Sequence, residues 1–130
     1  MNPFDPQYDR RRFQRLALNL SVNYRVEDPW YVRLKIGDQE IEATALNVSE
    51  GGMALVTDHN VPVSTLLFIT FSLFKADRHG EIVFFTPVVT DGKVRSNLSY
   101  DRESFRLGIA FVRTGPQASS SLQRFIKLAS

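Results

Sequence analysis

The sequence predicts an all-β domain that ends in a single helix. Apolar and polar residues alternate over several short segments, and Gly, Pro, Asn and Asp residues mark turns between them. Only the last dozen or so residues change to a helical period. Short strands at this spacing favour a barrel or a sandwich, and 130 residues suffice for one domain with one core.

The N-terminal third of the chain contains the first two predicted strands. Residues 1–9 hold two prolines and no periodic apolar pattern, so we expect a flexible segment there. Apolar side chains then occupy every second position over 16–26, which predicts a strand with one buried face. Residues 30–36 alternate in the same way and predict a second strand. Gly37-Asp38 predicts a tight turn after it.

The middle and late strands follow from the same pattern. Strands are expected where alternation or β-rich composition recurs, at 41–45, 53–57, 66–73, 81–90, 93–97 and 105–111. Pro87 indicates an edge position or a bulge, because proline cannot donate to a ladder. Asp91-Gly92 is a strong hairpin signal and predicts that 93–97 runs antiparallel to 81–90. Phe74, Phe84 and Phe85 fit either the core or a partner surface, and we expect them in the core.

The C-terminal segment predicts a helix over 118–129. Serines at 119–121 offer capping hydroxyls, and Leu122, Phe125, Ile126 and Ala129 fall on one helical face. We therefore expect one domain over 10–130, made of an arginine arm (10–15), a barrel (16–113) and this helix.

Several classes of protein do not fit the sequence. It has no apolar run of membrane-spanning length, no signal peptide and no cysteine, so we expect a cytoplasmic protein that does not insert into membranes. His59 and His79 fall in predicted turns without metal-ligand spacing. No nucleophile elbow or phosphate-binding loop is present. We expect no metal site, no cofactor, no catalytic residue and no enzymatic activity.

Positive charge is concentrated near the N-terminus although the net charge is only +2. Arg10, Arg11, Arg12 and Arg15 are four of the twelve arginines and fall within six residues. Arginine grips phosphates and purine edges with two hydrogen bonds, which lysine cannot do. On charge alone, a solvated basic tail and a segment that binds a polyanion are equally good interpretations.

Two short patterns stand out. Arg11 and Arg15 form R-x-x-x-R, which is uninformative alone because Arg102 and Arg106 repeat it. Asn47, Ser49 and Gly52 form [D/N]-x-S-x-x-G, which no other segment of the chain matches. By itself it is also compatible with a polar turn, in which Asn47 and Ser49 bond backbone amides and Gly52 adopts a strained conformation.

Together and in this order, the two patterns resemble those of the PilZ domain family. The resemblance extends through Gly52-Met53-Ala54-Leu55, the late segment Arg106–Phe111 and the closing helix, and covers residues 8–129. It implies a six-stranded antiparallel β-barrel of the split, Greek-key type and a receptor for cyclic di-GMP. Arg11, Arg15, Asn47, Ser49 and Gly52 match the family's ligand-binding positions. The long stretch between Glu27 and Thr44 leaves room for an extra hairpin.

The chemistry of these residues fits that ligand. Cyclic di-GMP carries two phosphate charges and two guanines whose O6 and N7 accept a bidentate arginine fork. Asn47 offers a carbonyl to guanine donors, Ser49 a hydroxyl, and Gly52 close approach of the backbone. We expect the arm to be mobile when free and ordered when bound, which would change the surface presented to a protein partner.

Arg10 and Arg12 are added as candidate ligand-binding residues. In the family, the residue before the paired arginines influences whether one nucleotide or a stacked pair binds, and Arg10 favours a stacked pair. Two other functions stay open. One is a PilZ-like protein-interaction module that binds no nucleotide, and the other is a nucleic-acid-binding barrel. The second is disfavoured because the basic residues sit in one arm instead of on an aromatic sheet face. The downstream partner, affinity and oligomeric state are not encoded in these patterns.

Overall fold

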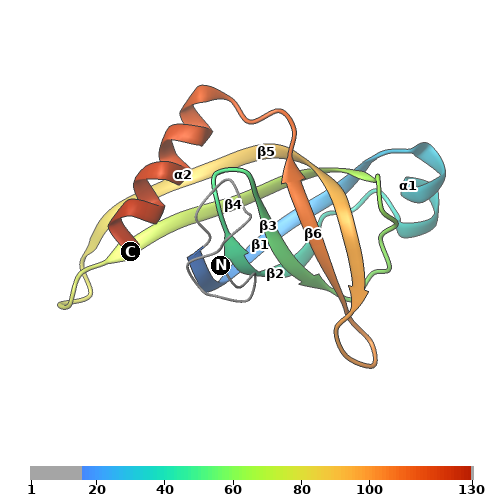
Figure 1. Cartoon of the computed structure of the whole chain (residues 1–130), viewed down its shortest axis with the longest axis horizontal. Coiled ribbons are helices and arrows are strands. Elements are labelled where there is room, and N and C mark those ends of the chain that lie inside the picture. The colour runs from blue at the N-terminus through green and yellow to red at the C-terminus, as the bar shows by residue number, and fades with distance from the viewer. Residues whose placement is uncertain (1–15, 130) are drawn as a thin grey trace, which may run out of the picture.

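The computed structural model of the chain describes residues 16–129. Six antiparallel strands form one sheet with the order β1-β2-β3-β6-β5-β4, which closes into a barrel because β1 also pairs with β4 (Figure 1). The strands are β1 (Leu16–Asp28), β2 (Ile41–Val48), β3 (Gly52–Thr57), β4 (Leu66–Ala76), β5 (Ile82–Ser99) and β6 (Phe105–Phe111). The helices are α1 (Trp30–Ile36) and α2 (Pro116–Ala129). The prediction of six antiparallel strands with a C-terminal helix is confirmed.

The core is built by the alternating side chains that the sequence predicts to face inward. Along β1, Val22, Tyr24 and Val26 are buried, while Ser21 and Arg25 are exposed. The inward faces of the other strands and of α2 complete one apolar cluster. Burial of apolar surface therefore follows the period of two expected for strands that are covered on one face.

Residues 30–36 form helix α1 instead of the predicted strand. The amides of Val32 and Arg33 both donate to the carbonyl of Pro29, and the amide of Gly37 donates to Arg33 at 2.7 Å and ends the helix. Val32 is buried, and Ile36 packs against the core one helical turn later. Apolar residues at 30, 32, 34 and 36 alternate as in a strand, but 32 and 36 are also one helical turn apart. In the structure this i, i+4 pair is the one that packs against the core. No extra hairpin forms between Glu27 and Thr44; α1 occupies that stretch.

The predicted hairpin at Asp91-Gly92 is wrong. These residues lie inside β5, which runs without a break from Ile82 to Ser99. A β-carbon on Gly92 would meet Cγ2 of Ile109 and, at 2.9 Å, Cδ1 of Ile69. Glycine is needed here because the strand passes close to side chains in the barrel interior, and not because the chain turns.

The two ends of β5 have different neighbours. β5 pairs with β4 from Ile82 to Lys93, but it pairs with β6 only from Gly92 to Ser99. In the first part of β5, one edge of the strand therefore does not pair with β6. Pro87 lies in this part, in agreement with the predicted edge position. With β4, this part forms a two-stranded ribbon.

Helix α2 packs on the β4–β5 ribbon through Leu122, Phe125 and Ile126 (Figure 1). The Phe125 ring lies 6.2 Å from the ring of Phe84, and the Arg124 guanidinium lies over the same Phe84 ring at 5.4 Å. The helix begins at Pro116, two residues before the predicted start. No helix of the described part of the chain is long and apolar enough to cross a bilayer.

Of the three phenylalanines expected in the core, only Phe84 is buried. Phe74 and Phe85 pair across β4 and β5 and are 54% and 61% exposed. Their positions put them on the opposite face of the ribbon from Phe84, so the core prediction is wrong for both.

Candidate functional site

The polar motif forms the connection between β2 and β3, beside the place where β1 begins. Leu16 pairs with Val48, and Ala17 pairs with Asn47. The first described residue, Leu16, therefore lies next to this turn. Arg10, Arg11, Arg12 and Arg15, like the expected flexible segment 1–9, lie outside the described residues.

Asn47 sits at an irregularity in both of its ladders. The register shifts between Ala45 and Asn47 in the β2–β3 pair, and between Ala17 and Leu20 in the β1–β2 pair. The side-chain oxygen Oδ1 of Asn47 accepts a hydrogen bond from the amide of Ala54 at 3.2 Å. A bulge leaves backbone groups out of the regular ladder, and an asparagine side chain replaces the missing partner.

Ser49 is hydrogen-bonded to other residues of the same turn. Its amide donates to the carbonyl of Gly52 at 2.8 Å, and its hydroxyl donates to the same carbonyl at 3.3 Å. The same hydroxyl accepts from the amide of Gly51 at 3.2 Å, and the side chain is buried. These are the turn-type bonds expected of a serine before glycine. One lone pair of the hydroxyl stays available for a further donor.

Gly52 is required by the neighbouring strand. A β-carbon at this position would meet the carbonyl oxygen of Ile109 and lie 3.1 Å from the carbonyl carbon of the same residue. Gly52 is not among the residues with positive φ in the described chain, so the strained conformation considered from the sequence is wrong. Close pairing of β3 with β6 explains the glycine without a ligand.

Glu50, which the motif leaves unspecified, links the turn to α2. Its Oε1 accepts a hydrogen bond from the Ser119 hydroxyl and another from the Gln123 side-chain amide, both at 2.7 Å. No pattern in the sequence indicates these contacts, because the partners lie about seventy residues further along the chain.

A family model described as PilZ domain matches residues 9–128, which is nearly the whole chain. The chain belongs to the PilZ domain family. No curated protein sequence matches it. The family predicted from the two motifs is confirmed.

Solved structures with the same fold include PilZ domains. The chain is similar to the Bacillus subtilis inhibitor of motility, MotI/DgrA, with a TM-score of 0.68 and 19% identity over 92% of this chain and 51% of that one. It thus spans about half the length of that protein. It is also similar to the PilZ domain of YcgR from Escherichia coli, solved with cyclic di-GMP, with a TM-score of 0.60 and 17% identity over 93% and 92% of the two chains. At these identities the likeness shows a shared fold.

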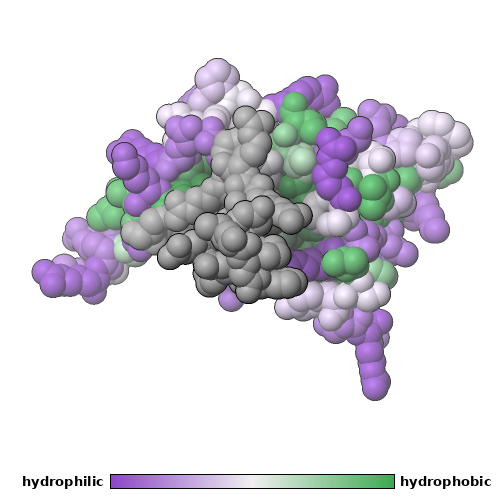
Figure 2. Space-filling view, in the orientation of Figure 1, coloured by the Kyte–Doolittle hydropathy of each residue, from purple (hydrophilic) through white to green (hydrophobic). Residues whose placement is uncertain are grey.

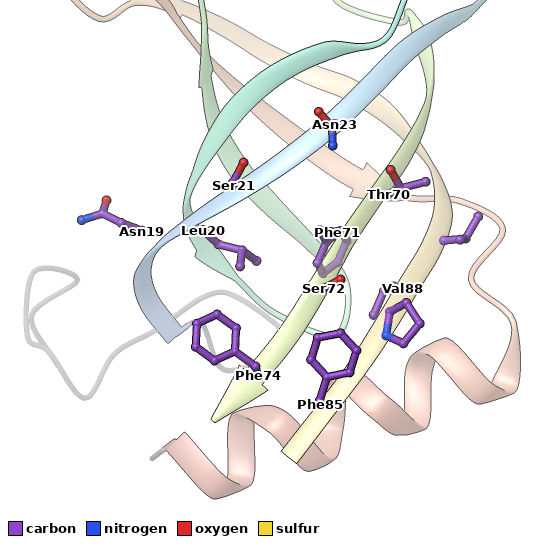
Figure 3. A pocket seen from close by; sticks show the side chains of 12 residues that line it. Asn19, Leu20, Ser21, Asn23, Thr70, Phe71, Ser72, Phe74, Phe85 and Val88 are labelled. Atoms are coloured by element: carbon purple, nitrogen blue, oxygen red, sulfur yellow. The ribbon is translucent and has the colours of Figure 1, made fainter. Parts of the chain in front are cut away.

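A hollow of about 520 Å³ opens in this PilZ domain where β1 and β4 separate. Their ladder ends at Val22 and Phe71, and beyond this pair β1 follows β2 while β4 follows β5. Figure 3 shows Leu20 of β1, Phe74 of β4 and Phe85 of β5 lining the opening. The hollow is mainly apolar, with polar groups such as Asn23, Thr70 and Ser72 on one side.

Apolar surface continues along the end of the β4–β5 ribbon. Ile82 and Val83 are 62% and 55% exposed, and Figure 2 shows apolar side chains gathered beside α2 at this end of the molecule. Exposed apolar groups in one area indicate an interaction surface more often than isolated ones do.

A cluster of charged residues lies where β1, β5 and the end of β6 meet. Arg113 binds Asp91 at 2.9 Å and Glu27 at 3.6 Å. Burial and the neighbouring carboxyl of Asp91 raise the pKa of Glu27 above its ordinary value, against the opposing effect of Arg113. Arg113 lies between the two carboxyl groups and offsets part of the repulsion between them.

Metal ligands do not gather in the described residues. No group of three or more His, Asp and Glu side chains between residues 16 and 129 is placed to hold an ion. His59 and His79 lie in loops, as the sequence predicts.

Proposed function

We propose that this PilZ domain is a cyclic di-GMP receptor that acts in the cytoplasm through a protein partner. The observation that supports the proposal is the pairing of Leu16, the residue that follows the arginine arm in the sequence, with Val48 beside the Asn47–Gly52 turn. PilZ domains are receptor domains for this nucleotide, and the YcgR domain of the same fold was solved with it. We assign no catalytic step and no cofactor to the chain.

The arm has the reach and the chemistry for this role. Arg15 is adjacent to Leu16, and Arg11 is five positions from it, so the segment from Arg11 to the start of β1 can span at most about 18 Å. Guanidinium groups on such a segment would bind guanine O6 and N7 edges and phosphates across the turn. Asn47 would contribute side-chain polar groups, and Ser49 its remaining lone pair. We include Arg10 and Arg12 as further cations, with a stacked pair of nucleotides as the expected ligand.

Binding would order the arm and so change the surface shown to a partner. Amide exchange of residues 5–15 tests this step, which requires fast exchange without nucleotide and slow exchange with it. Slow exchange in the free protein would leave the arm nothing to switch.

The apolar hollow between β1 and β4 favours a protein partner in addition to the nucleotide. Phe74 and Phe85 line it and remain exposed, and grouped exposed aromatic side chains are typical of a surface that binds a partner. This surface also serves the alternative function, a PilZ protein-interaction module that binds no nucleotide. A nucleic-acid-binding role has no comparable support, because these aromatic side chains are not accompanied by basic groups in the hollow.

Titration calorimetry with cyclic di-GMP tests the proposal. The wild-type chain should bind, and Arg15→Ala should weaken binding by about ten- to a hundredfold, the loss expected for one charge-assisted contact. Arg106→Ala is the matched control, because Arg106 has the same motif spacing but pairs with Val56 and Leu98, away from the turn. Wild-type protein that binds no nucleotide would favour the interaction-module alternative. A stoichiometry of one nucleotide per chain would contradict the stacked pair of nucleotides but not the receptor function.

A further inference from the structure

We propose that Glu50 couples the nucleotide site to helix α2, so that α2 reports whether cyclic di-GMP is bound. This inference rests on the proposed function and adds to it the element through which the signal leaves the site. It starts from the two hydrogen bonds that the Glu50 carboxylate accepts from Ser119 and Gln123, each at 2.7 Å.

The Glu50 carboxylate binds two residues on one face of α2. Ser119 and Gln123 are four residues apart and therefore lie one turn above the other on α2. One carboxylate oxygen, Oε1, receives both donors. Hydrogen bonds to a charged acceptor are shorter and stronger than neutral ones. The Glu50 contact thus fixes the helix in position along its first two turns.

Glu50 cannot move without its neighbours in the turn. On one side, the amide and hydroxyl of Ser49 bond the carbonyl of Gly52. On the other, the Gly51 amide donates to the Ser49 hydroxyl, and the Gly51 carbonyl accepts from the amide of Phe111 at 2.9 Å. A ligand donor that binds the remaining lone pair of the Ser49 hydroxyl acts on the same group that makes these bonds. Any adjustment of the turn then shifts the backbone of Glu50 and, with it, the contact to α2.

The helix connects this turn to a different part of the fold. Apart from the Glu50 contact, α2 buries Leu122, Phe125 and Ile126 against the β4–β5 ribbon. Exposed Val83 lines a shallow pocket together with Ser120 and Arg124 of the helix. The Phe84–Phe125 and Arg124–Phe84 contacts belong to this second attachment. A change at the first attachment therefore alters how the helix sits beside the apolar end of the ribbon. The coupling is reciprocal: a turn held by α2 is also better arranged for nucleotide.

Hydrogen exchange of the α2 amides, with and without saturating cyclic di-GMP, tests the coupling when combined with calorimetry on the same samples. In wild-type protein, nucleotide should change α2 exchange by about fivefold, the low end of typical coupling. In Glu50→Ala this response should disappear, and the affinity should fall by about the same factor. In Gln123→Ala, which keeps the bond between Ser119 and Glu50, the response should be weaker than in wild type. Glu42→Ala, which removes an exposed glutamate from β2, should behave as wild type.

The outcomes separate this inference from the proposed function. Wild-type protein that binds no nucleotide overturns both. Wild-type protein that binds nucleotide, but whose α2 exchange is unchanged or changes equally in Glu50→Ala, overturns the coupling and leaves the receptor function intact. Gln123→Ala keeps the test valid if Glu50→Ala fails to fold, because Gln123 is exposed and its removal leaves the turn intact.

Discussion

Gly52 lies so close to Ile109 across the β3–β6 ladder that a β-carbon on it would meet the Ile109 carbonyl oxygen. The obstacle is backbone, which cannot move aside as a flexible side chain can. Gly52→Ala should therefore destabilise the nucleotide-free protein by about 1–3 kcal/mol, as overpacking of a filled site does. Urea denaturation of the free protein measures this loss.

Gly115→Ala provides the comparison for that substitution. A β-carbon at Gly115 would meet no atom within 4 Å, so its stability should stay within about 0.5 kcal/mol of wild type. If Gly52→Ala were as stable as Gly115→Ala but failed to bind cyclic di-GMP, the glycine would serve the ligand and not the pairing of β3 with β6.

Phe84 and Phe85 test the assignment of the two faces of the β4–β5 ribbon. Phe84 is buried against Phe125 of α2, so Phe84→Ala should cost about 3–5 kcal/mol. Phe85 is mostly exposed beside the hollow, and Phe85→Ala should cost less than about 1 kcal/mol. Thermal and urea unfolding of the two variants, side by side, measure the difference. Equal losses would mean that the hollow is closed over Phe85 in solution.

Arg113 should matter more for stability at neutral pH than in acid. It contacts both Glu27 and Asp91, and the raised pKa of Glu27 means that ionising this carboxyl is less favourable in the folded chain than in the unfolded one. The stability associated with protonated Glu27 is present at low pH and is lost as pH rises through its elevated pKa. Arg113→Met should deepen that loss because, of the described residues, Arg25 alone then opposes the repulsion between the two carboxyl groups.

The expected cost of Arg113→Met is about 0.5–1 kcal/mol at pH 7, since the guanidinium is largely exposed, and less near pH 4. Urea unfolding at both pH values measures it. Arg95→Met, which removes an exposed arginine elsewhere on β5, is the control. A cost that is the same at both pH values would show that Arg113 acts through packing of its side chain.

The strands that were predicted correctly are those whose pattern has one interpretation. Alternation over 16–26 is too long for its apolar residues to share one helical face, and Val22, Tyr24 and Val26 all point to one side of β1. Residues 30–36 failed because alternation also places Val32 and Ile36 one helical turn apart, and burial of that pair decides for α1. Asp91-Gly92 failed because glycine there serves close packing against Ile109, which depends on a strand that follows later in the chain.

The candidate site also contains residues that a sequence pattern identifies and one residue that no pattern identifies. Asn47, Ser49 and Gly52 are recognisable because their spacing is local, and the structure places them in one turn beside the start of β1. Glu50 carries no such signal, since its role depends on Ser119 and Gln123 of α2. Contacts between distant segments are fixed by the closed fold and not by any spacing along the chain.

Tyr24 should make the protein sensitive to alkaline pH. It is fully buried, and its hydroxyl lies 2.6 Å from Oγ1 of Thr57. Burial raises its pKa from 10.0 to about 12, although the bond to Thr57 opposes the shift. The folded protein thus keeps a proton that the unfolded chain releases, so this contribution to stability is complete below pH 10 and is lost as pH rises toward 12.

The loss over that interval should reach about 2–3 kcal/mol, from 1.36 kcal/mol for each unit of pKa. Tyr24→Phe should cost about 1–2 kcal/mol at pH 8, because the buried bond between the Tyr24 and Thr57 hydroxyls is lost. The variant should then lose less further stability above pH 10 than wild type does. Tyr31→Phe, on the exposed side of α1, should keep the wild-type pH dependence. Urea unfolding from pH 8 to 11.5 distinguishes these cases. Parallel curves for wild type and Tyr24→Phe would show that other groups cause the alkaline loss, because the phenol is the one group that this substitution removes.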